Sequence, residues 1–235
     1  MQVETFTTQS EALEIHGNIH WPPNLPAPGV ICSHGLFSSK ESPKFIAIAE
    51  YLAREGFAAI RYDHRGCGQS AGKIEETTVS GRLEDLAAVY RFAGRDPRIN
   101  GNIGLLGSSM GGYISLFTAA RYPAIKALCV WATPFKMRGA PAQVGDETYP
   151  LLKDCFYEDL QKYQLREVLG QVKPCLVLHG QDDELVPVWH AERIYAGLAD
   201  PKFLEIFPGG DHRFTVERHR RRAMQRSAEF FKKYL

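Results

Sequence analysis

The sequence has no apolar run of about 18 residues, the length that a helix needs to cross a membrane. The stretch from Met1 to Phe6 has neither the basic start nor the apolar segment of a secretory signal. Neither charge is in excess, because 28 lysines and arginines balance 27 aspartates and glutamates, so no long-range field draws nucleic acid or an anionic membrane to the protein. These absences predict a cytoplasmic protein whose partner is a small molecule, with no nucleic acid and no membrane.

Cysteine is scarce, and the 5 thiols are scattered along the chain in odd number. Cys32, Cys129 and Cys175 lie inside apolar runs, where a free thiol behaves as a small hydrophobic side chain. Neither a disulfide framework nor a metal-binding spacing follows from this set. We therefore expect no metal and no cofactor, and the sequence leaves the oligomeric state unknown.

Length and hydrophobic content favour one domain. A chain of 235 residues with 44% hydrophobic residues is long enough for one sizeable core, which predicts a single domain over residues 1–235. Residues 1–22 alternate imperfectly between apolar and polar, and this pattern predicts two antiparallel strands at an exposed edge.

Beyond residue 28, short apolar runs alternate with longer stretches of helical spacing. Continuous apolar runs are typical of strands buried on both faces of a parallel sheet, and they lie at residues 29–33, 58–62, 103–106, 127–132, 175–178 and 203–207. The helical stretches are residues 43–55, 79–94, 110–122, 154–169, 190–198 and 215–234. This order predicts an α/β fold with a doubly wound, mostly parallel eight-stranded sheet flanked by helices.

The strongest local motif is Gly107-Ser108-Ser109-Met110-Gly111, which directly follows one apolar run and precedes a helical stretch. This G-x-S-x-G pattern is typical of a nucleophile elbow, whose sharp turn exposes the serine hydroxyl at the carboxyl end of the sheet. Side chains at either glycine would collide with neighbouring backbone in such a turn. The motif predicts Ser109 as a catalytic nucleophile, and the alternative interpretation is an ordinary Gly-rich helix cap.

A serine hydroxyl needs a base, and the base needs a carboxylate that orients it. In enzymes with this elbow the acid follows the serine and the histidine follows the acid. Asp183 lies in the loop after run 175–178 and is the predicted acid, with Asp182 as second choice. His212 lies in a Gly-flanked loop after the last predicted strand and is the predicted base. Other histidines are left unassigned, namely His20, His64, His190 and His219.

Two backbone N–H groups must stabilise the negative charge that develops on the reacting carbonyl oxygen. Met110 follows the nucleophile and is predicted to supply one of them. The other is predicted in the loop after run 29–33, where Leu36 is the first choice and Phe37 the alternative. Because these groups act through the backbone, both assignments depend on position alone.

Several motifs stand in the order found in the α/β-hydrolase superfamily and span most of the chain. They are His34-Gly35-Leu36, Asp63–Ser70, Gly107–Gly111, His179–Pro187 and Gly210-Asp211-His212. Within that superfamily, the first and last motifs are most similar to those of small carboxylesterases, which include cinnamoyl and feruloyl esterases. The resemblance implies Ser109, Asp183 and His212 as a catalytic triad, Leu36 and Met110 as oxyanion donors, and a structural role for Asp63 and Arg65.

The same resemblance implies a serine hydrolase, a carboxylesterase in the first place, that cleaves an ester or thioester of a small molecule through an acyl-serine intermediate. Two alternatives stay open: a peptidase or amidase related to the prolyl oligopeptidase catalytic domain, and a catalytically silent hydrolase-fold binding protein. Cinnamoyl esterases carry a longer lid insertion after the sixth strand. A reduced lid is therefore expected here at residues 135–155, with residues 135–142 as a short flap.

Overall fold

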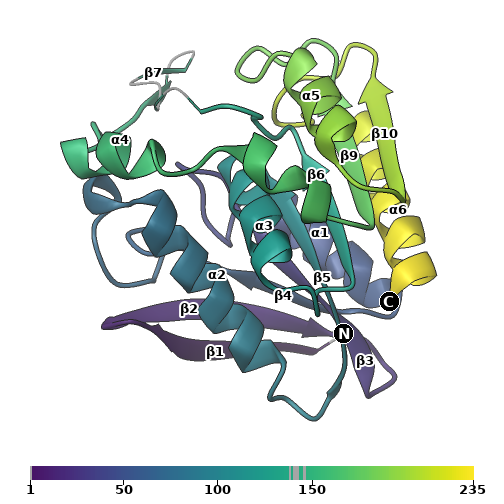
Figure 1. Ribbon diagram of the computed structural model, residues 1–235. Helices are drawn as coiled ribbons and strands as arrows, with labels where there is room; N and C mark the ends of the chain where they lie inside the picture. The colour runs from purple at the N-terminus through teal and green to yellow at the C-terminus, as the bar shows by residue number, and fades with distance from the viewer. Residues whose placement is uncertain (1, 138, 140–142, 145–146) are drawn as a thin grey trace.

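The computed structural model describes residues 2–137, 139, 143–144 and 147–235, and one large sheet forms its centre (Figure 1). The strands of this sheet are β1 (Gln2–Ser10), β2 (Leu13–Trp21), β3 (Ala27–Ser33), β4 (Ala58–Tyr62), β5 (Ile99–Ser108), β6 (Ala127–Trp131), β9 (Cys175–Gly180) and β10 (Lys202–Phe207). Their spatial order is β1-β2-β4-β3-β5-β6-β9-β10. Two short strands, β7 (Gln143–Val144) and β8 (Glu147–Thr148), pair with each other outside this sheet.

Strand direction confirms the predicted mostly parallel eight-stranded sheet. Neighbours run parallel from β4 through β10 in the spatial order, whereas β2 is antiparallel to both β1 and β4. The prediction that both opening strands lie at an exposed edge was wrong for β2, which lies inside the sheet and is buried from Gly17 to Trp21. Burial on both faces explains why its residues do not alternate cleanly.

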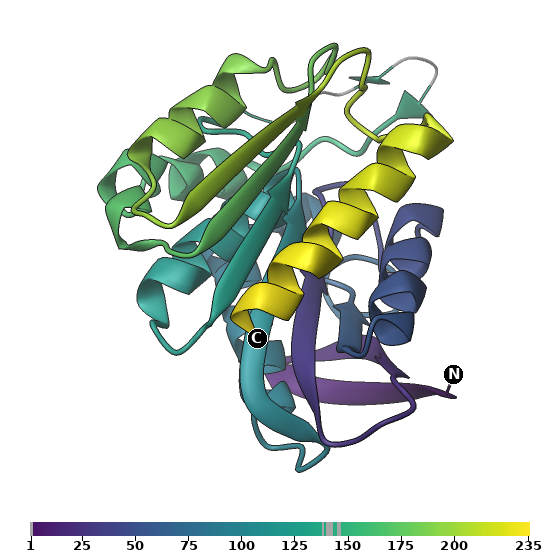
Figure 2. The same cartoon turned by 90° about the vertical axis from the view of Figure 1, so that its right-hand side faces the viewer.

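Helices cover both faces of the sheet, which confirms the doubly wound architecture (Figures 1 and 2). α1 (Pro43–Arg54) and α6 (Glu217–Tyr234) pack on one face, and α2 (Val79–Ala93), α3 (Met110–Arg121) and α5 (Trp189–Gly197) pack on the other. In β3, Val30 and Cys32 join the core beneath α1 and α6, whereas Ile31 joins the opposite core. Each central strand is therefore buried on both sides.

The predicted helix over residues 154–169 ends early. α4 covers only Asp154–Leu160, and two 3₁₀ turns follow, η2 (Leu165–Glu167) and η3 (Leu169–Gln171); a third, η1 (Ile74–Glu76), precedes α2. The Asp159 carboxylate accepts hydrogen bonds from the N–H and hydroxyl of Ser80 in α2, and the Tyr163 carbonyl accepts one from the Tyr113 hydroxyl. These tertiary contacts outweigh the helical periodicity of the segment, so the helix ends at Leu160.

The loops that follow the carboxyl ends of the parallel strands lie together at one end of the sheet. In parallel strands the carboxyl ends lie together, so the loops after β3, β5, β9 and β10 meet there. These loops carry the residues that the sequence predicts as functional. In the part of the chain that the structure describes, no helix has the length and apolar character to span a membrane.

Candidate active site

Ser109 stands at a strained turn between β5 and α3. Its backbone has φ 55° and ψ −126°, a conformation that costs a serine energy and that the surrounding structure must hold in place. The Ser109 N–H donates to the Trp131 carbonyl at 2.9 Å. A Cβ at Gly107 would lie 2.5 Å from the Gly111 carbonyl oxygen, and a Cβ at Gly111 would overlap the Ser33 carbonyl. The Ser109 hydroxyl makes no capping hydrogen bond, so the helix-cap interpretation does not describe its role.

Asp183 and His212 meet across the loops after β9 and β10. His212 Nδ1 lies 2.8 Å and 3.0 Å from the two carboxylate oxygens, and both side chains are buried. The N–H groups of Leu185 and Val186 donate to Asp183 Oδ1 at 3.0 Å and 2.7 Å. An ionised carboxylate only accepts hydrogen bonds, so His212 carries its proton on Nδ1 and leaves Nε2 as an acceptor.

A second histidine supports the same carboxylate. Burial alone would raise the pKa of Asp183, but hydrogen bonds from His179 and His212 outweigh it and hold this pKa well below its usual range. His179 Nε2 lies 2.7 Å from the Val186 carbonyl and 3.3 Å from Asp183 Oδ2. Sequence reasoning missed this contact, although the spacing of four residues across a tight loop is a signal that could have found it.

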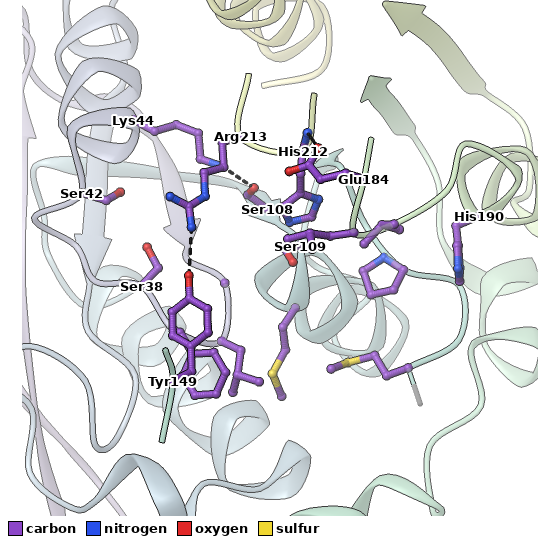
Figure 3. Close-up of a pocket in the computed structure, with 18 of the residues that line it drawn as sticks. Ser38, Ser42, Lys44, Ser108, Ser109, Tyr149, Glu184, His190, His212 and Arg213 are labelled. Atoms are coloured by element: carbon purple, nitrogen blue, oxygen red, sulfur yellow. Dashed lines mark hydrogen bonds between the residues drawn. The ribbon is translucent and has the colours of Figure 1, made fainter. Parts of the chain in front are cut away.

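Ser109 and His212 line the same cavity, which has a volume of about 850 Å³ and lies at the carboxyl edge of the sheet (Figure 3). Met110, Leu185 and Val186 form part of its apolar wall. Among the described residues, no hydrogen bond joins the Ser109 hydroxyl to His212. Catalytic hydrogen bonds of this kind are often long without substrate and tighten when it binds.

The predicted oxyanion donors lie on two sides of the nucleophile. Met110 is the first residue of α3, where backbone N–H groups have no partner within the helix. Leu36 and Phe37 follow β3, and both line the cavity together with Ser109. Gly35 packs so closely that a Cβ there would lie 3.3 Å from Ser109 Cβ. The structure therefore brings the predicted donors together but does not choose between Leu36 and Phe37.

Buried Arg82 of α2 holds the loop that carries these donors. Its guanidinium donates to the Leu36 carbonyl at 3.0 Å, the Gly35 carbonyl at 3.4 Å and the Thr77 hydroxyl at 3.0 Å. In a trans peptide the N–H points opposite to the carbonyl, so the N–H groups of Leu36 and Phe37 point away from Arg82. Sequence reasoning missed Arg82, because an arginine inside a helical stretch is ordinarily exposed.

Asp63 and Arg65 have the structural surroundings that the resemblance implies. The Asp63 carboxylate accepts the N–H groups of Lys40 at 2.7 Å and Gln69 at 3.0 Å, which fixes the loop after β4. Arg65 Nη2 donates to Asp85 Oδ1 at 2.8 Å. Neither residue lines the cavity that contains the predicted nucleophile.

A second Ser–His–Asp arrangement lies inside the protein. Ser33 Oγ is 2.9 Å from His64 Nε2, and His64 Nδ1 is 3.5 Å from Asp85 Oδ2. All three residues are 0% exposed, and burial lowers the pKa of His64 to about 4. Because no substrate reaches a fully buried hydroxyl, this cluster is structural, and access distinguishes Ser109 from Ser33.

The other unassigned histidines lie outside the Asp183–His212 pair. His20 accepts a hydrogen bond from Arg61 at 2.9 Å, and His219 is buried in α6. His190 lines the cavity, and its Nδ1 accepts the N–H of Phe135 at 2.9 Å. It thereby anchors the beginning of the segment that the sequence predicts as a lid.

The predicted lid at residues 135–155 is described only in part, because residues 138, 140–142 and 145–146 lie outside the described residues. Half of the predicted flap at residues 135–142 belongs to these positions, namely 138 and 140–142. Of the described residues, Met137 and Tyr149 line the cavity, and the Tyr149 ring stacks on Phe37 at a centroid distance of 4.5 Å. No cluster of metal-ligating side chains is found in the described part of the chain.

Comparison with known families identifies the fold. The family model described as alpha/beta hydrolase fold matches residues 28–167, which is more than half of the chain. The protein therefore belongs to the α/β-hydrolase fold family. This membership agrees with the mostly parallel sheet and with the elbow that β5 and α3 form.

Individual relatives are distant. The mitochondrial palmitoyl-protein thioesterase ABHD10 from Mus musculus is 28% identical over 210 residues, which cover 79% of this chain and 69% of that protein. The uncharacterized protein YqkD from Bacillus subtilis is 29% identical over 232 residues, with 89% and 72% covered.

Solved structures show the same fold at low identity. Est1E from Butyrivibrio proteoclasticus with bound ferulic acid has a TM-score of 0.86 and 23% identity, with 97% of this chain and 98% of that chain covered. The α/β hydrolase GrgF from Penicillium sp. sh18 has a TM-score of 0.87 and 18% identity, with 100% and 99% covered.

Proposed function

We propose that this protein is a serine hydrolase that cleaves a carboxylic ester or thioester of a small molecule, with Ser109 as nucleophile. One observation carries the proposal: the strained Ser109 turn lies in the wall of a cavity that His212 also lines, while Asp183 binds the far side of His212. Membership of the α/β-hydrolase family supports it, as does a relative named as a thioesterase.

In the proposed reaction, His212 Nε2 accepts the hydroxyl proton while Ser109 Oγ bonds to the carbonyl carbon of the substrate. The carbonyl oxygen takes the negative charge, and the N–H groups of Met110 and Leu36 stabilise it, each such donor contributing about 2.7–4 kcal/mol. Collapse of this intermediate breaks the bond to the leaving group, which takes the proton from His212. Water then attacks the acyl-serine with His212 as base, which releases the acid and restores Ser109.

The two alternatives receive less support. Among the relatives named above, the one with a stated activity acts on a thioester, which favours ester and thioester cleavage over a peptidase or amidase. The chain keeps a serine, an acid and a histidine in the order that this elbow requires, which speaks against a catalytically silent binding protein.

The test compares the protein with two neighbouring serine variants on a short neutral p-nitrophenyl ester, a short acyl thioester and a matched p-nitroanilide. We expect turnover of the ester and the thioester and little turnover of the anilide. Ser109→Ala should lose about 10³-fold or more in kcat, because the residues of a triad act as a unit. Ser108→Ala is the matched control and should keep its ester turnover. Full activity of Ser109→Ala would overturn the proposal.

A further inference from the structure

A second cavity lies beside β1, the outermost strand at one edge of the sheet (Figure 1). Its volume is about 690 Å³, which is within the range of ligand-binding pockets. Thr8 and Gln9 of β1 line one side of this cavity, and the end of α2 together with residues 95–98 lines the other side. None of these residues lines the Ser109 cavity. We call this second cavity the β1 groove.

The backbone of β1 has free hydrogen-bonding groups next to the groove. Gln9 pairs with Glu14 of β2, and the Glu14 carbonyl points away from β1 because it accepts the N–H of Ala71 at 2.9 Å. In an antiparallel pair, two opposite residues turn their backbone groups either toward each other or both away. The N–H and C=O of Gln9, and those of Thr7 two residues earlier, therefore point out of the sheet. No described strand pairs with β1 on that side.

β1 lacks the features that usually keep an edge strand from pairing. Its 9 residues include no lysine and no proline, and they pair with β2 without a bulge. Its one charged residue, Glu4, is already paired with Arg98. The strand at the other edge, β10, carries Lys202 and Glu205, and Glu205 also forms ion pairs with two arginines of α6. The edge of β1 is therefore the more open one to a further strand.

The opposite wall of the groove carries two arginines without an acidic partner. Arg91 lies in the last turn of α2, Arg95 follows just after the helix, and both are exposed. Within the part of the chain that the structure describes, neither side chain forms an ion pair or a hydrogen bond. The third arginine of the lining, Arg98, binds the carboxylates of Asp96 and Glu4, each at 2.7 Å. Two uncompensated positive charges thus lie beside the free backbone groups of β1.

We propose that the β1 groove binds an acidic, extended segment of a partner protein, which adds as a strand to β1 while its carboxylates bind Arg91 and Arg95. Strand addition of this kind takes its affinity from main-chain hydrogen bonds and its specificity from alternate side chains. Phe6 of β1 stacks on Phe92 of α2, and Thr8 lies on the same face two residues later. Acidic side chains on that face of the added strand reach the arginines. This site is independent of the proposed hydrolase activity.

Strand geometry determines which residues of the segment bond to β1. The free backbone groups belong to Thr7 and Gln9, whose side chains point away from α2. In an antiparallel addition, the residues opposite them turn their own backbone groups to β1 and their side chains away from α2. The residues in between present their side chains to Arg91 and Arg95 and turn their backbone groups outward. The segment therefore bonds to β1 through every second residue only.

The first experiment tests the charge. The probe is a capped hexapeptide of alternating glutamate and threonine, titrated into the ¹⁵N-labelled protein, and the Kd is read from the NMR shifts of the Gln9 and Arg95 amides. We expect a Kd at least about tenfold lower than for the same peptide with glutamine in place of glutamate. The double variant Arg91→Gln and Arg95→Gln should lose this difference. Arg54→Gln is the matched control, since Arg54 is also an exposed arginine in the last turn of a helix, α1.

The second experiment tests strand addition on the wild-type protein, so that no variant has to fold. Two versions of the glutamate probe carry N-methyl groups, one on all threonines and one on all glutamates, and both have the same charge. Only one set of alternate residues bonds to β1, so one version should bind at least about tenfold more weakly than the other. For an antiparallel strand, the weaker one is the version methylated on threonine.

Equal Kd values for the two methylated probes would overturn the proposal, as would equal Kd values for the glutamate probe in the wild type and in the double arginine variant. If inorganic tripolyphosphate shifts the same amides while the methylated probes do not differ, the groove is a simple anion site and strand addition is wrong. The absence of any shift with the glutamate probe at up to about 1 mM would also overturn the proposal.

Discussion

Replacing Asp183 by asparagine keeps the shape of the side chain and removes its charge. Oδ1 accepts the N–H groups of Leu185 and Val186, so the amide oxygen of the variant should occupy that position. The amide nitrogen then takes the place of Oδ2, which lies 2.8 Å from His212 Nδ1. Two donors would face each other, and His212 would have to move its proton from Nδ1 to Nε2. The nitrogen that should accept the Ser109 proton would then carry one.

This tautomer change sets the size of the expected effect. Loss of the correct tautomer in a triad lowers kcat by about 10⁴-fold, which corresponds to about 5 kcal/mol of barrier at 1.36 kcal/mol per tenfold. The fold should survive, because the amide oxygen keeps both backbone hydrogen bonds. We therefore expect Asp183→Asn to lose kcat on a neutral p-nitrophenyl ester at pH 7 while its urea unfolding midpoint changes little.

Asp182→Asn is the matched control, since Asp182 is the neighbouring carboxylate, is exposed and was the second choice from the sequence. It should keep kcat within a few-fold of the wild-type value. The reasoning is refuted if Asp183→Asn keeps kcat within about tenfold with its fold intact, or if Asp182→Asn loses as much as Asp183→Asn does.

A further prediction concerns the oxyanion loop. Arg82→Lys loses the planar guanidinium contact to the Gly35 and Leu36 carbonyls, which holds the oxyanion loop in place. Steady-state kinetics should therefore show kcat lowered by about 10²-fold with KM nearly unchanged. A raised KM at unchanged kcat would contradict this positioning role.

Local motifs made much of the fold and the elbow predictable from the sequence. Each buried strand of the parallel sheet is a continuous apolar run, and the residues expected to act together follow such runs. Because the carboxyl ends of parallel strands meet at one edge, chain order alone brings Asp183 near His212, which the structure places 2.8 Å apart. Glycines at positions 107 and 111 mark the turn that no other residue fits.

Long-range contacts account for what the sequence did not predict. α4 ends where Asp159 binds Ser80, 79 residues away, and no local pattern encodes that contact. Arg82 reaches the Leu36 carbonyl across 46 residues, and a buried arginine inside a helix has no signature of its own. Lys44 and Arg213 line the same cavity only because the beginning of α1 and the loop after β10 lie beside each other, which follows from the assembled sheet rather than from either segment.

The most direct test of the account is to find which residue becomes covalently modified. The protein is treated with a fluorophosphonate at neutral pH, digested, and the modified peptide is sequenced by mass spectrometry. We predict a single adduct on Ser109, undiminished in Ser108→Ala and absent in Ser109→Ala. An adduct on Ser108, or no adduct on a folded protein that still hydrolyses esters, would contradict the assignment of Ser109 as the nucleophile.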